Sequence, residues 1–359
     1  MDSPVVHLAV ISDSHFFLPT LVMLTSARAN MRPESRYLVH FFHRGLKPYQ
    51  IDALRQLETP AFSMELHGLD TGHWDSFARI GEFPPIVLAR LELPSLLPEL
   101  DRVLYLDGDI IVHGDLSQLY ATELGENLLA AVREIALAHS DYPRQSGIPE
   151  SINSGVMVMN LARMREENCI GQFLRTKAEA PASWLYPDQD VLSVCCAGRI
   201  HFLPPRCNGM IRHYRDITSQ GMEAFNQFFG TSYPDPEELE ADFLLTHLAG
   251  THGQRPWEST HSICGDLWEH YFRSSPLRHL ELRRNPIPRR NNGTDYQLFG
   301  CLPLLSIRHK YLPQSDTLKT RVLLFGCLPL LIAKGQARMV TWKLFSFIPL
   351  WKSRTSERG

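Results

Sequence analysis

The sequence predicts an α/β protein with a mostly parallel central sheet flanked by helices. Short β-branched or apolar runs alternate with segments of helical spacing through the first 110 residues, and short polar stretches separate them. An acidic residue follows the first apolar run, and another follows the run at 103–106. Because parallel strands present their carboxyl ends at one edge of an open sheet, we expect these acids to border a ligand crevice.

The elements can be justified in chain order. Residues 5–12 are β-branched and end just before Asp13, as expected of a first parallel strand, and residues 18–30 place Leu21, Leu24 and Ala27 at helical spacing. The same criteria predict further strands at 37–43, 61–69, 103–106, 153–161 and 241–250, and further helices at 49–58, 162–179 and within 186–198.

Composition narrows the protein class. The chain has 359 residues, 44% of them hydrophobic and 21% charged, which is ordinary for a globular protein and argues against disorder or several membrane spans. Its seven cysteines include no CxxC pair, so we expect neither a zinc site built from cysteines nor a disulfide framework, and we expect a reducing, cytoplasmic compartment. The first residues lack the basic stretch of a signal peptide.

The charge balance changes near residue 278. From there to the end there are 15 Lys or Arg against 4 Asp or Glu, whereas residues 1–277 hold 21 against 35. The motif LFGCLPLL occurs at 298–305 and again at 324–331, with a related LFSFIPLW at 344–351, and basic residues follow each copy. We therefore predict a catalytic domain at 1–277 and a basic, apolar C-terminal extension at 278–359.

The sequence LYLDGDIIV at 104–112 places two acids at the end of a buried strand. Burying carboxylates without partners costs several kcal/mol, so a cation is expected beside Asp107 and Asp109. A turn at Gly108 would let both carboxylates converge, and hard oxygen ligands suit Mg²⁺ or Mn²⁺. Taken alone, the acid pair is equally well explained as the cap of a turn.

Five motifs in order give the chain a resemblance to a known family. They are VISDSHF (10–16), LARLELPSLLPELDRVLYLDGDIIV (88–112), INSGVMVMNL (152–161), YPDQDVL (186–192) and HLAGTHGQRPW (247–257). From about Val5 to Trp257 the chain resembles glycosyltransferase family eight, the retaining transferases that include bacterial lipopolysaccharide galactosyl- and glucosyltransferases and glycogenin. The resemblance implies a GT-A nucleotide-diphosphosugar fold, a UDP-sugar donor and dependence on Mn²⁺ or Mg²⁺.

The resemblance also implies roles for individual residues. It makes Asp107, Asp109 and His247 the metal ligands, with Gly108 between the acids. The remaining assignments are Ile11 and Asp13 at the uracil and ribose; Arg90 near the donor phosphate and sugar; Asn153, Asp188, Gln189 and Asp190 around the transferred sugar; and Gly250 and Arg255 over the diphosphate. Two positions depart from the family pattern, because His15 replaces a residue that is often Asn and Arg255 stands where Lys is usual.

Each of these residues, taken singly, could also have a purely structural role. Arg90 fits a surface arginine, His247 a buried structural histidine, and Asn153 a turn residue. Asp188 and Asp190 fit helix N-caps. The ordered set of five motifs favours the functional interpretation.

The function expected is that of a hexosyltransferase moving galactose or glucose from UDP-galactose or UDP-glucose to a glycan, most plausibly the lipopolysaccharide core oligosaccharide. A divalent ion would stabilise the leaving diphosphate. Retention could proceed through a covalent intermediate or by front-face attack. The alternatives are the same chemistry on a protein or soluble sugar, a phosphatase with a nucleophilic Asp in its DxD motif, and a non-catalytic scaffold.

The C-terminal extension suggests a further partner. Apolar segments interleaved with Lys and Arg can lie at a bilayer interface, and clustered cations gain about 1 kcal/mol each near anionic lipid. We expect 278–359 to dock on the cytoplasmic face of the inner membrane, where it would meet a glycolipid acceptor, and we expect no nucleic-acid partner. The alternative is that these segments pack on the catalytic domain with their cations in solvent.

Overall fold

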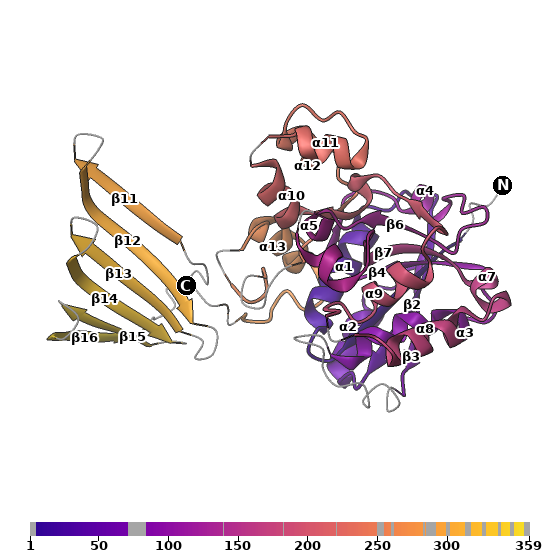
Figure 1. Ribbon diagram of the computed structural model, residues 1–359. Coiled ribbons are helices and arrows are strands. Elements are labelled where there is room, and N and C mark those ends of the chain that lie inside the picture. Colours follow the sequence, from indigo (N-terminus) through magenta and orange to yellow (C-terminus); the bar gives the residue numbers. More distant parts are fainter. Residues whose placement is uncertain are drawn as a thin grey trace. The chain divides into compact units, whose positions relative to one another are not determined.

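We describe a computed structural model of the chain, which covers residues 5–70, 84–138, 140–181, 183–219, 221–249, 255–259, 262–282, 284 and the strands between 292 and 354 (Figure 1). The chain forms two compact units, residues 1–249 with 266–280, and residues 250–265 with 281–359. Whether the functional boundary falls at 277 stays a prediction.

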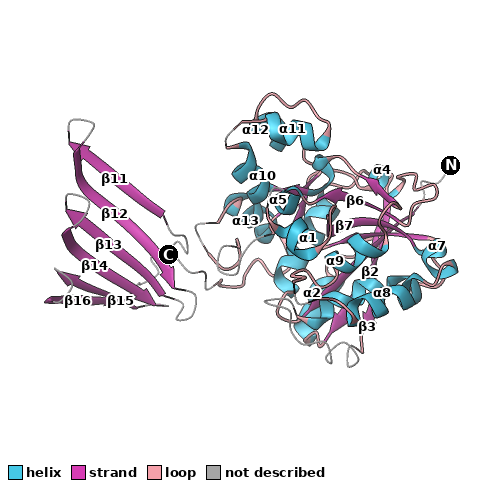
Figure 2. Ribbon diagram, in the orientation of Figure 1, coloured by secondary structure: helices cyan, strands magenta, loops and turns pink. Residues whose placement is uncertain are grey.

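A seven-stranded sheet organises the first unit, in the order β3-β2-β1-β4-β7-β6-β8. Its strands are among those drawn in magenta in Figure 2. Only β7 runs against its neighbours β4 and β6; the other pairings in the sheet are parallel. The strands are β1 Val5–Asp13, β2 Arg36–Arg44, β3 Phe62–Gly68, β4 Arg102–Leu106, β6 Leu129–Arg133, β7 Ile152–Asn160 and β8 Ile200–Phe202. The prediction of a mostly parallel central sheet flanked by helices is confirmed.

A small second sheet, β5-β10-β9, continues from the end of β4. β10 runs antiparallel to β5 and parallel to β9. The strands are β5 Ile110–Val112, β9 Gly209–Met210 and β10 Leu245–His247. This sheet brings a late segment of the chain beside the two acids at 107 and 109.

Helices cover the large sheet and fill the connections. The α-helices are α1 Phe17–Ala29, α2 Pro48–Arg55, α3 Leu93–Leu96, α4 Ser117–Tyr120, α5 Ile135–Ala138, α6 Tyr142–Ser146, α7 Leu161–Glu166, α8 Cys169–Ala178, α9 Gln189–Cys195, α10 Ile211–Thr218, α11 Glu223–Phe229, α12 Pro236–Ala241 and α13 Gly265–Ser274. The described residues also include two 3₁₀ helices, η2 Pro85–Glu92 and η3 Pro205–Asn208. No helix within the described ranges has the length and apolar content to cross a bilayer.

One helix prediction is wrong. The segment 162–179 forms two helices, α7 and α8, because Asn168 takes a left-handed backbone conformation with φ of 51° between them. Asparagine is among the residues that tolerate this conformation, which interrupts the helical hydrogen-bond ladder. The predicted strand at 241–250 is also shorter than expected, since α12 extends to Ala241 and β10 covers only Leu245–His247.

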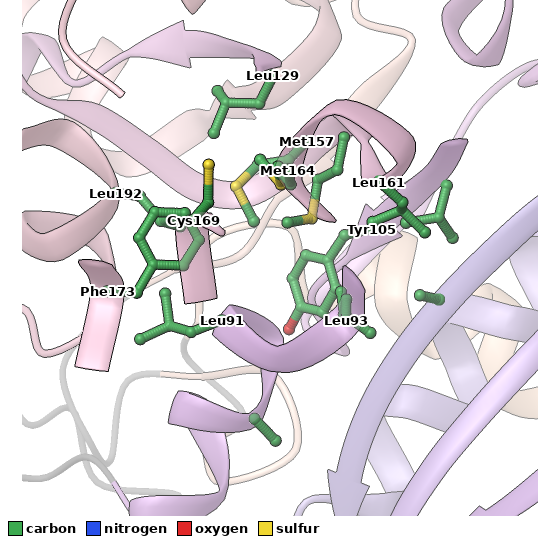
Figure 3. Packing of buried hydrophobic residues seen from close by; sticks show 14 of the residues in the cluster. Leu91, Leu93, Tyr105, Leu129, Met157, Leu161, Met164, Cys169, Phe173 and Leu192 are labelled. Atoms are coloured by element: carbon green, nitrogen blue, oxygen red, sulfur yellow. The ribbon is translucent and has the colours of Figure 1, made fainter. Parts of the chain in front are cut away.

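The hydrophobic core supports one face of the large sheet. Figure 3 shows side chains from η2, α3, β4, β7 and the helices α7–α9 meeting there. Its members include Leu91, Tyr105, Met157, Phe173 and Leu192, each 1% exposed or less. This packing fixes the ends of β4 and β7, on which the candidate site is built.

The second unit contains a six-stranded antiparallel meander, which the sequence analysis did not predict. The strands are β11 Asn292–Leu298, β12 Leu302–Leu312, β13 Thr317–Leu324, β14 Leu328–Gln336, β15 Met339–Leu344 and β16 Ile348–Arg354. Each copy of the repeated motif begins on the last residue of one strand and continues into the next, at β11–β12, β13–β14 and β15–β16. Each pairing also shifts register near the motif's proline: Pro303, Pro329 or Pro349. The repeat therefore corresponds to one hairpin used three times.

Candidate active site

The two acids converge because the chain turns at Gly108. Asp107 follows β4, where its backbone N–H donates to the Gly155 carbonyl at 2.8 Å. A Cβ at position 108 would clash with the Thr20 hydroxyl of α1, so glycine is required for this close approach. The turn expected from the sequence is present.

His247 joins the acids through the small sheet. It ends β10 and pairs with Ile110, the residue after Asp109. Its Nε2 lies 3.2 Å from Asp109 Oδ1. One ligand atom each from Asp107, Asp109 and His247 fall within 4.8 Å of one another. We call these three residues the acid–histidine cluster.

A chain of amide hydrogen bonds orients His247. The ring Nδ1 lies 2.9 Å from Asn208 Oδ1, an acceptor, so we assign the ring proton to Nδ1. Asn208 in turn donates to Asn153 Oδ1 at 2.8 Å, and Asn153 donates to Glu134 Oε2 at 3.0 Å. This tautomer leaves the Nε2 lone pair facing Asp109, as a metal-binding histidine requires.

Gly155 leaves room for the acid–histidine cluster. An added Cβ there would lie 2.9 Å from Asp107 Oδ2 and 3.0 Å from Asn153 Oδ1, and closer still to His247 Cε1. Glycine at this position of β7 therefore lets the imidazole and the carboxylates approach the strand.

Arg90 connects the acid–histidine cluster to a further carboxylate, that of Asp188. Its guanidinium is 3.0 Å from Asp107 Oδ1 and 3.1 Å from Asp188 Oδ2, and it stacks 4.6 Å from the centre of the Tyr105 ring. It also donates to Ser154 and to a main-chain carbonyl of η2. Burial acts to lower the pKa of Arg90, but the two carboxylates outweigh it and raise that pKa, so the residue is a permanent cation. Arg90 is 6% exposed, so it is not the surface arginine that the sequence alone would also allow.

The electrostatics favour cation binding. Burial raises the pKa of Asp107, and Arg90 opposes that shift while Asp109 adds to it. Burial acts to lower the pKa of His247, but the neighbouring carboxylates of Asp109, Asp107 and Glu134 together outweigh burial and raise that pKa. Two carboxylates this close repel each other, and a divalent cation relieves that repulsion. Two carboxylate oxygens and one imidazole are donors that fit Mn²⁺ or Mg²⁺, with Gly155 providing the space.

The predicted sugar-side residues divide into two groups. Asp188 lies at the N-cap position of α9 without capping it; its Oδ2 accepts instead from Ser154 Oγ at 2.7 Å. Gln189 Oε1 accepts from the Ser154 N–H at 3.3 Å. Asp190 is fully buried and accepts from Tyr142 at 2.6 Å and from the Tyr186 N–H at 2.8 Å. Asp188 and Gln189 therefore adjoin the Arg90 network, whereas Asp190 holds the loop before α9.

The remaining residues, which were predicted to contact the donor's nucleotide and diphosphate, have different neighbours. Asp13 ends β1 and accepts from the N–H groups of His15 and Phe16 at 2.9 and 2.8 Å, which turns the chain into α1. Ile11 is buried in the hydrophobic cluster. Arg255 belongs to the second unit, with its guanidinium 5.8 Å from the centre of the Trp257 ring. Gly250 lies outside the described residues.

Several site residues escaped the sequence analysis: Glu134, Ser154, Gly155 and Asn208. Ser154 and Gly155 stand inside the recognised INSGVMVMNL motif, which was the available signal. Asn208 offered none, because it comes near His247 only through the pairing of β9 with β10.

Comparison with solved structures agrees with the fold described above. The chain superposes on the galactosyltransferase LgtC, crystallised with donor and acceptor sugar analogues, with a TM-score of 0.65 at 20% identity, covering 75% of this chain and 96% of LgtC. The bifunctional glycosyltransferase WbbM gives a TM-score of 0.63 at 20% identity, covering 78% of this chain and 51% of WbbM. The fold is thus that of the GT-A glycosyltransferases.

Sequence comparison identifies the family. The profile of glycosyl transferase family 8 matches residues 7–230, and the chain belongs to that family. A lipopolysaccharide 1,2-glucosyltransferase of Escherichia coli K12 is 32% identical over 162 residues, 44% of this chain and 44% of its own length. General stress protein A of Bacillus subtilis is 22% identical over 284 residues, 75% of this chain and 93% of its own length. The chain thus spans less than half of the lipopolysaccharide enzyme at that identity.

Proposed function

We propose that the protein is a metal-dependent retaining hexosyltransferase that moves galactose or glucose from a UDP-sugar to a glycan, the lipopolysaccharide core oligosaccharide in particular. The observation that carries this proposal is the convergence of Asp107, Asp109 and His247 at the end of β4 in a family 8 chain. A protein or soluble sugar remains the alternative acceptor. Membership of family 8 disfavours the phosphatase alternative.

The acid–histidine cluster would hold Mn²⁺ or Mg²⁺ against the donor's diphosphate. Such an ion, when bound, neutralises the charge that develops on the leaving UDP. Asp107 is held by Tyr105, whose hydroxyl donates to its Oδ1 at 2.7 Å, and by Arg90. Two fixed partners keep this carboxylate in one orientation, which limits the reorganisation needed when the donor binds.

Arg90 acts in this proposal by positioning the two acids rather than by direct contact with phosphate. Its donors are already directed at Asp107, Asp188, Ser154 and a main-chain carbonyl. Because one rigid guanidinium contacts both carboxylates, the metal side and the sugar side of the site keep a fixed separation. That arrangement supports precise placement of the donor sugar.

Asp188 and Gln189 would face the transferred sugar. Both are 5% exposed, and both are held through Ser154. With its Oε1 occupied by a main-chain N–H, Gln189 has its amide nitrogen to donate to a sugar oxygen. A carboxylate and an amide there would stabilise an oxocarbenium-like sugar, in either a covalent or a front-face reaction.

The first test is calorimetric titration of the full chain with UDP in the presence of Mn²⁺, Mg²⁺ or EDTA. The proposal predicts binding that requires metal and is lost in Asp107→Asn. Transfer from UDP-galactose and UDP-glucose is then compared on core oligosaccharide, free hexoses and protein acceptors. Metal-independent UDP binding, or none, would contradict the metal site, and transfer only to protein would replace the proposed acceptor.

We also propose that the C-terminal sheet docks on an anionic membrane surface, where a glycolipid acceptor resides. The strand register places eight basic positions on one face of the meander: Arg308, Lys310, Lys319, Arg321, Lys334, Lys343, Lys352 and Arg354. The other face carries no Lys or Arg among the described strands and includes Ile307, Val322, Leu331 and Trp342. At about 1 kcal/mol for each cation near anionic lipid, such segregation supports docking through the basic face.

Flotation with anionic and neutral vesicles tests the docking. The full chain carrying Lys319→Gln and Arg321→Gln should bind anionic vesicles more weakly than wild type, because two basic positions on one face are lost. The control carries Arg144→Gln and Arg273→Gln, which remove the same charge from exposed side chains of the first unit. Equal loss in both double variants would show that net charge, and not this face, controls binding.

A further inference from the structure

A second cluster of ligand-type side chains lies on the sheet, outside the acid–histidine cluster. His7 on β1, His40 on β2, and Glu65 and His67 on β3 occupy one face of three adjacent strands. Register explains the grouping: His40 pairs with Glu65, and His67 lies two residues further along β3 on the same face. The three rings stack side by side, with centroids 5.3 Å apart for His7 and His40, and 5.7 Å for His40 and His67.

Three of these residues surround one point. His40 Nδ1 lies 3.3 Å from Glu65 Oε2, and His67 Nε2 lies 3.7 Å from the same oxygen. The three ligand atoms all fall within 4.8 Å of one another. Metal–ligand bonds of about 2.0–2.2 Å in a tetrahedron separate ligand atoms by roughly 3.4 Å, so small side-chain movements suffice to bind one ion.

Two nitrogens of this group, His40 Nδ1 and His67 Nε2, make no hydrogen bond to the described residues. His40 is 4% exposed, and both nitrogens are buried. The contacts with Glu65 are close but lack hydrogen-bond geometry. Buried polar atoms are normally paired, so this arrangement calls for an explanation.

The hydrogen bond made by the other nitrogen of His40, Nε2, offers an explanation for the unpaired Nδ1. Its Nε2 is 3.0 Å from His7 Nδ1, so one ring donates to the other. If His40 Nε2 carries the proton, its Nδ1 presents a lone pair towards the Glu65 carboxylate, and a cation between them removes the repulsion.

We propose that His40 Nδ1, His67 Nε2 and the Glu65 carboxylate form a site for one Zn²⁺ or similar transition-metal ion. Imidazole and carboxylate donors suit such ions better than Mg²⁺ or Ca²⁺. The Glu65 side chain is 54% exposed, which gives an ion access and leaves room for a water ligand. His7 would accept the Nε2 proton of His40 and act as a positioning residue. The bound ion would cross-link β2 to β3, the edge strand.

The test uses Co²⁺ as a spectroscopic probe on the full chain. Tetrahedral Co²⁺ absorbs visible light far more strongly than octahedral Co²⁺, which separates this site from an oxygen-rich site at Asp107 and Asp109. We expect one equivalent of strongly absorbing Co²⁺, displaced by Zn²⁺. The signal should disappear in His67→Gln and in Glu65→Gln, and it should persist in His43→Gln, a residue of β2 whose register places it on the opposite face.

His7→Phe distinguishes a metal site from a stack of hydrogen-bonded rings. Loss of a partner that orients a ligating histidine weakens metal binding about 10–100-fold, so the Co²⁺ affinity should fall by that factor. Zn²⁺ should also raise the melting temperature of wild type and His43→Gln by more than that of His67→Gln, which keeps only the acid–histidine cluster as a metal site. Wild type without the strong absorption, or His67→Gln and Glu65→Gln that both retain it, would overturn the proposal. Because Glu65 is exposed, Glu65→Gln decides the matter if His67→Gln fails to fold.

Discussion

Replacing Gly155 with alanine tests whether the space beside the acid–histidine cluster matters for metal binding. The added methyl would lie 2.9 Å from Asp107 Oδ2 and nearer still to His247 Cε1. Ordinary carbon contacts are about 3.5–4.0 Å, so the imidazole ring must move by roughly 1 Å. His247 cannot move freely, because Asn208 holds its Nδ1 at 2.9 Å.

The expected magnitudes follow from this displacement. Shifting a reacting or binding group by about 1 Å can cost about 10²-fold in rate, so Gly155→Ala should reduce metal-dependent turnover by that order. Overpacking a rigid site costs about 1–3 kcal/mol of unfolding free energy, which leaves the protein folded. Activity should therefore fall much more than stability.

The assay compares UDP release and Mn²⁺ affinity in wild type, Gly155→Ala and Gly68→Ala. Gly68 ends β3, and a Cβ there meets no described atom within 4 Å, so its alanine variant should behave as wild type. Unchanged turnover and Mn²⁺ affinity in Gly155→Ala would refute the argument that this glycine shapes the cluster.

Three further changes have defined outcomes. Asn208→Ala frees the His247 ring and should weaken Mn²⁺ binding about 10–100-fold in a calorimetric titration. Arg90→Gln leaves the buried Asp188 and the partly buried Asp107 without their cation and should cost about 3 kcal/mol in urea unfolding. Burial opposes ionisation of Asp115, but hydrogen bonds from the main-chain N–H groups of Arg32 and Ser117 and from the Ser117 and Ser35 hydroxyls lower its pKa to about 2. Its contribution, about 1 kcal/mol after solvent screening, is complete above pH 4 and lost as pH falls through 2, so Asp115→Asn should be less stable at neutral pH and approach wild type in acid.

The parallel sheet was predictable because its signals are local. Each strand from β1 to β4 is a short apolar run, and Asp13 and Asp107 mark strand ends. The break at Asn168 was not predictable from periodicity, because the helical pattern continues through it. The C-terminal meander was missed for a different reason: its repeats were interpreted as apolar segments at a bilayer interface, although alternating basic positions such as 308 and 310 carry the two-residue period of strands.

The three members of the acid–histidine cluster were predictable from the sequence, whereas most residues that orient them were not. Asp107 and Asp109 are separated by one residue in the sequence, and the resemblance supplied His247. The orientation of His247 depends on Asn208, and that of Asp107 on Arg90, through contacts between residues far apart in the chain. Such contacts depend on strand pairing and packing, which no single-sequence motif reports.

The most direct test of the central claim is release of UDP from UDP-galactose and UDP-glucose, with Mn²⁺ or with EDTA, by wild type and Asp109→Asn. Slow transfer to water needs no acceptor. We expect metal-dependent release from at least one donor and its loss in Asp109→Asn, whose remaining oxygen and amide bind a cation more weakly than a carboxylate. Equal release by wild type and Asp109→Asn, or release unaffected by EDTA, would contradict it.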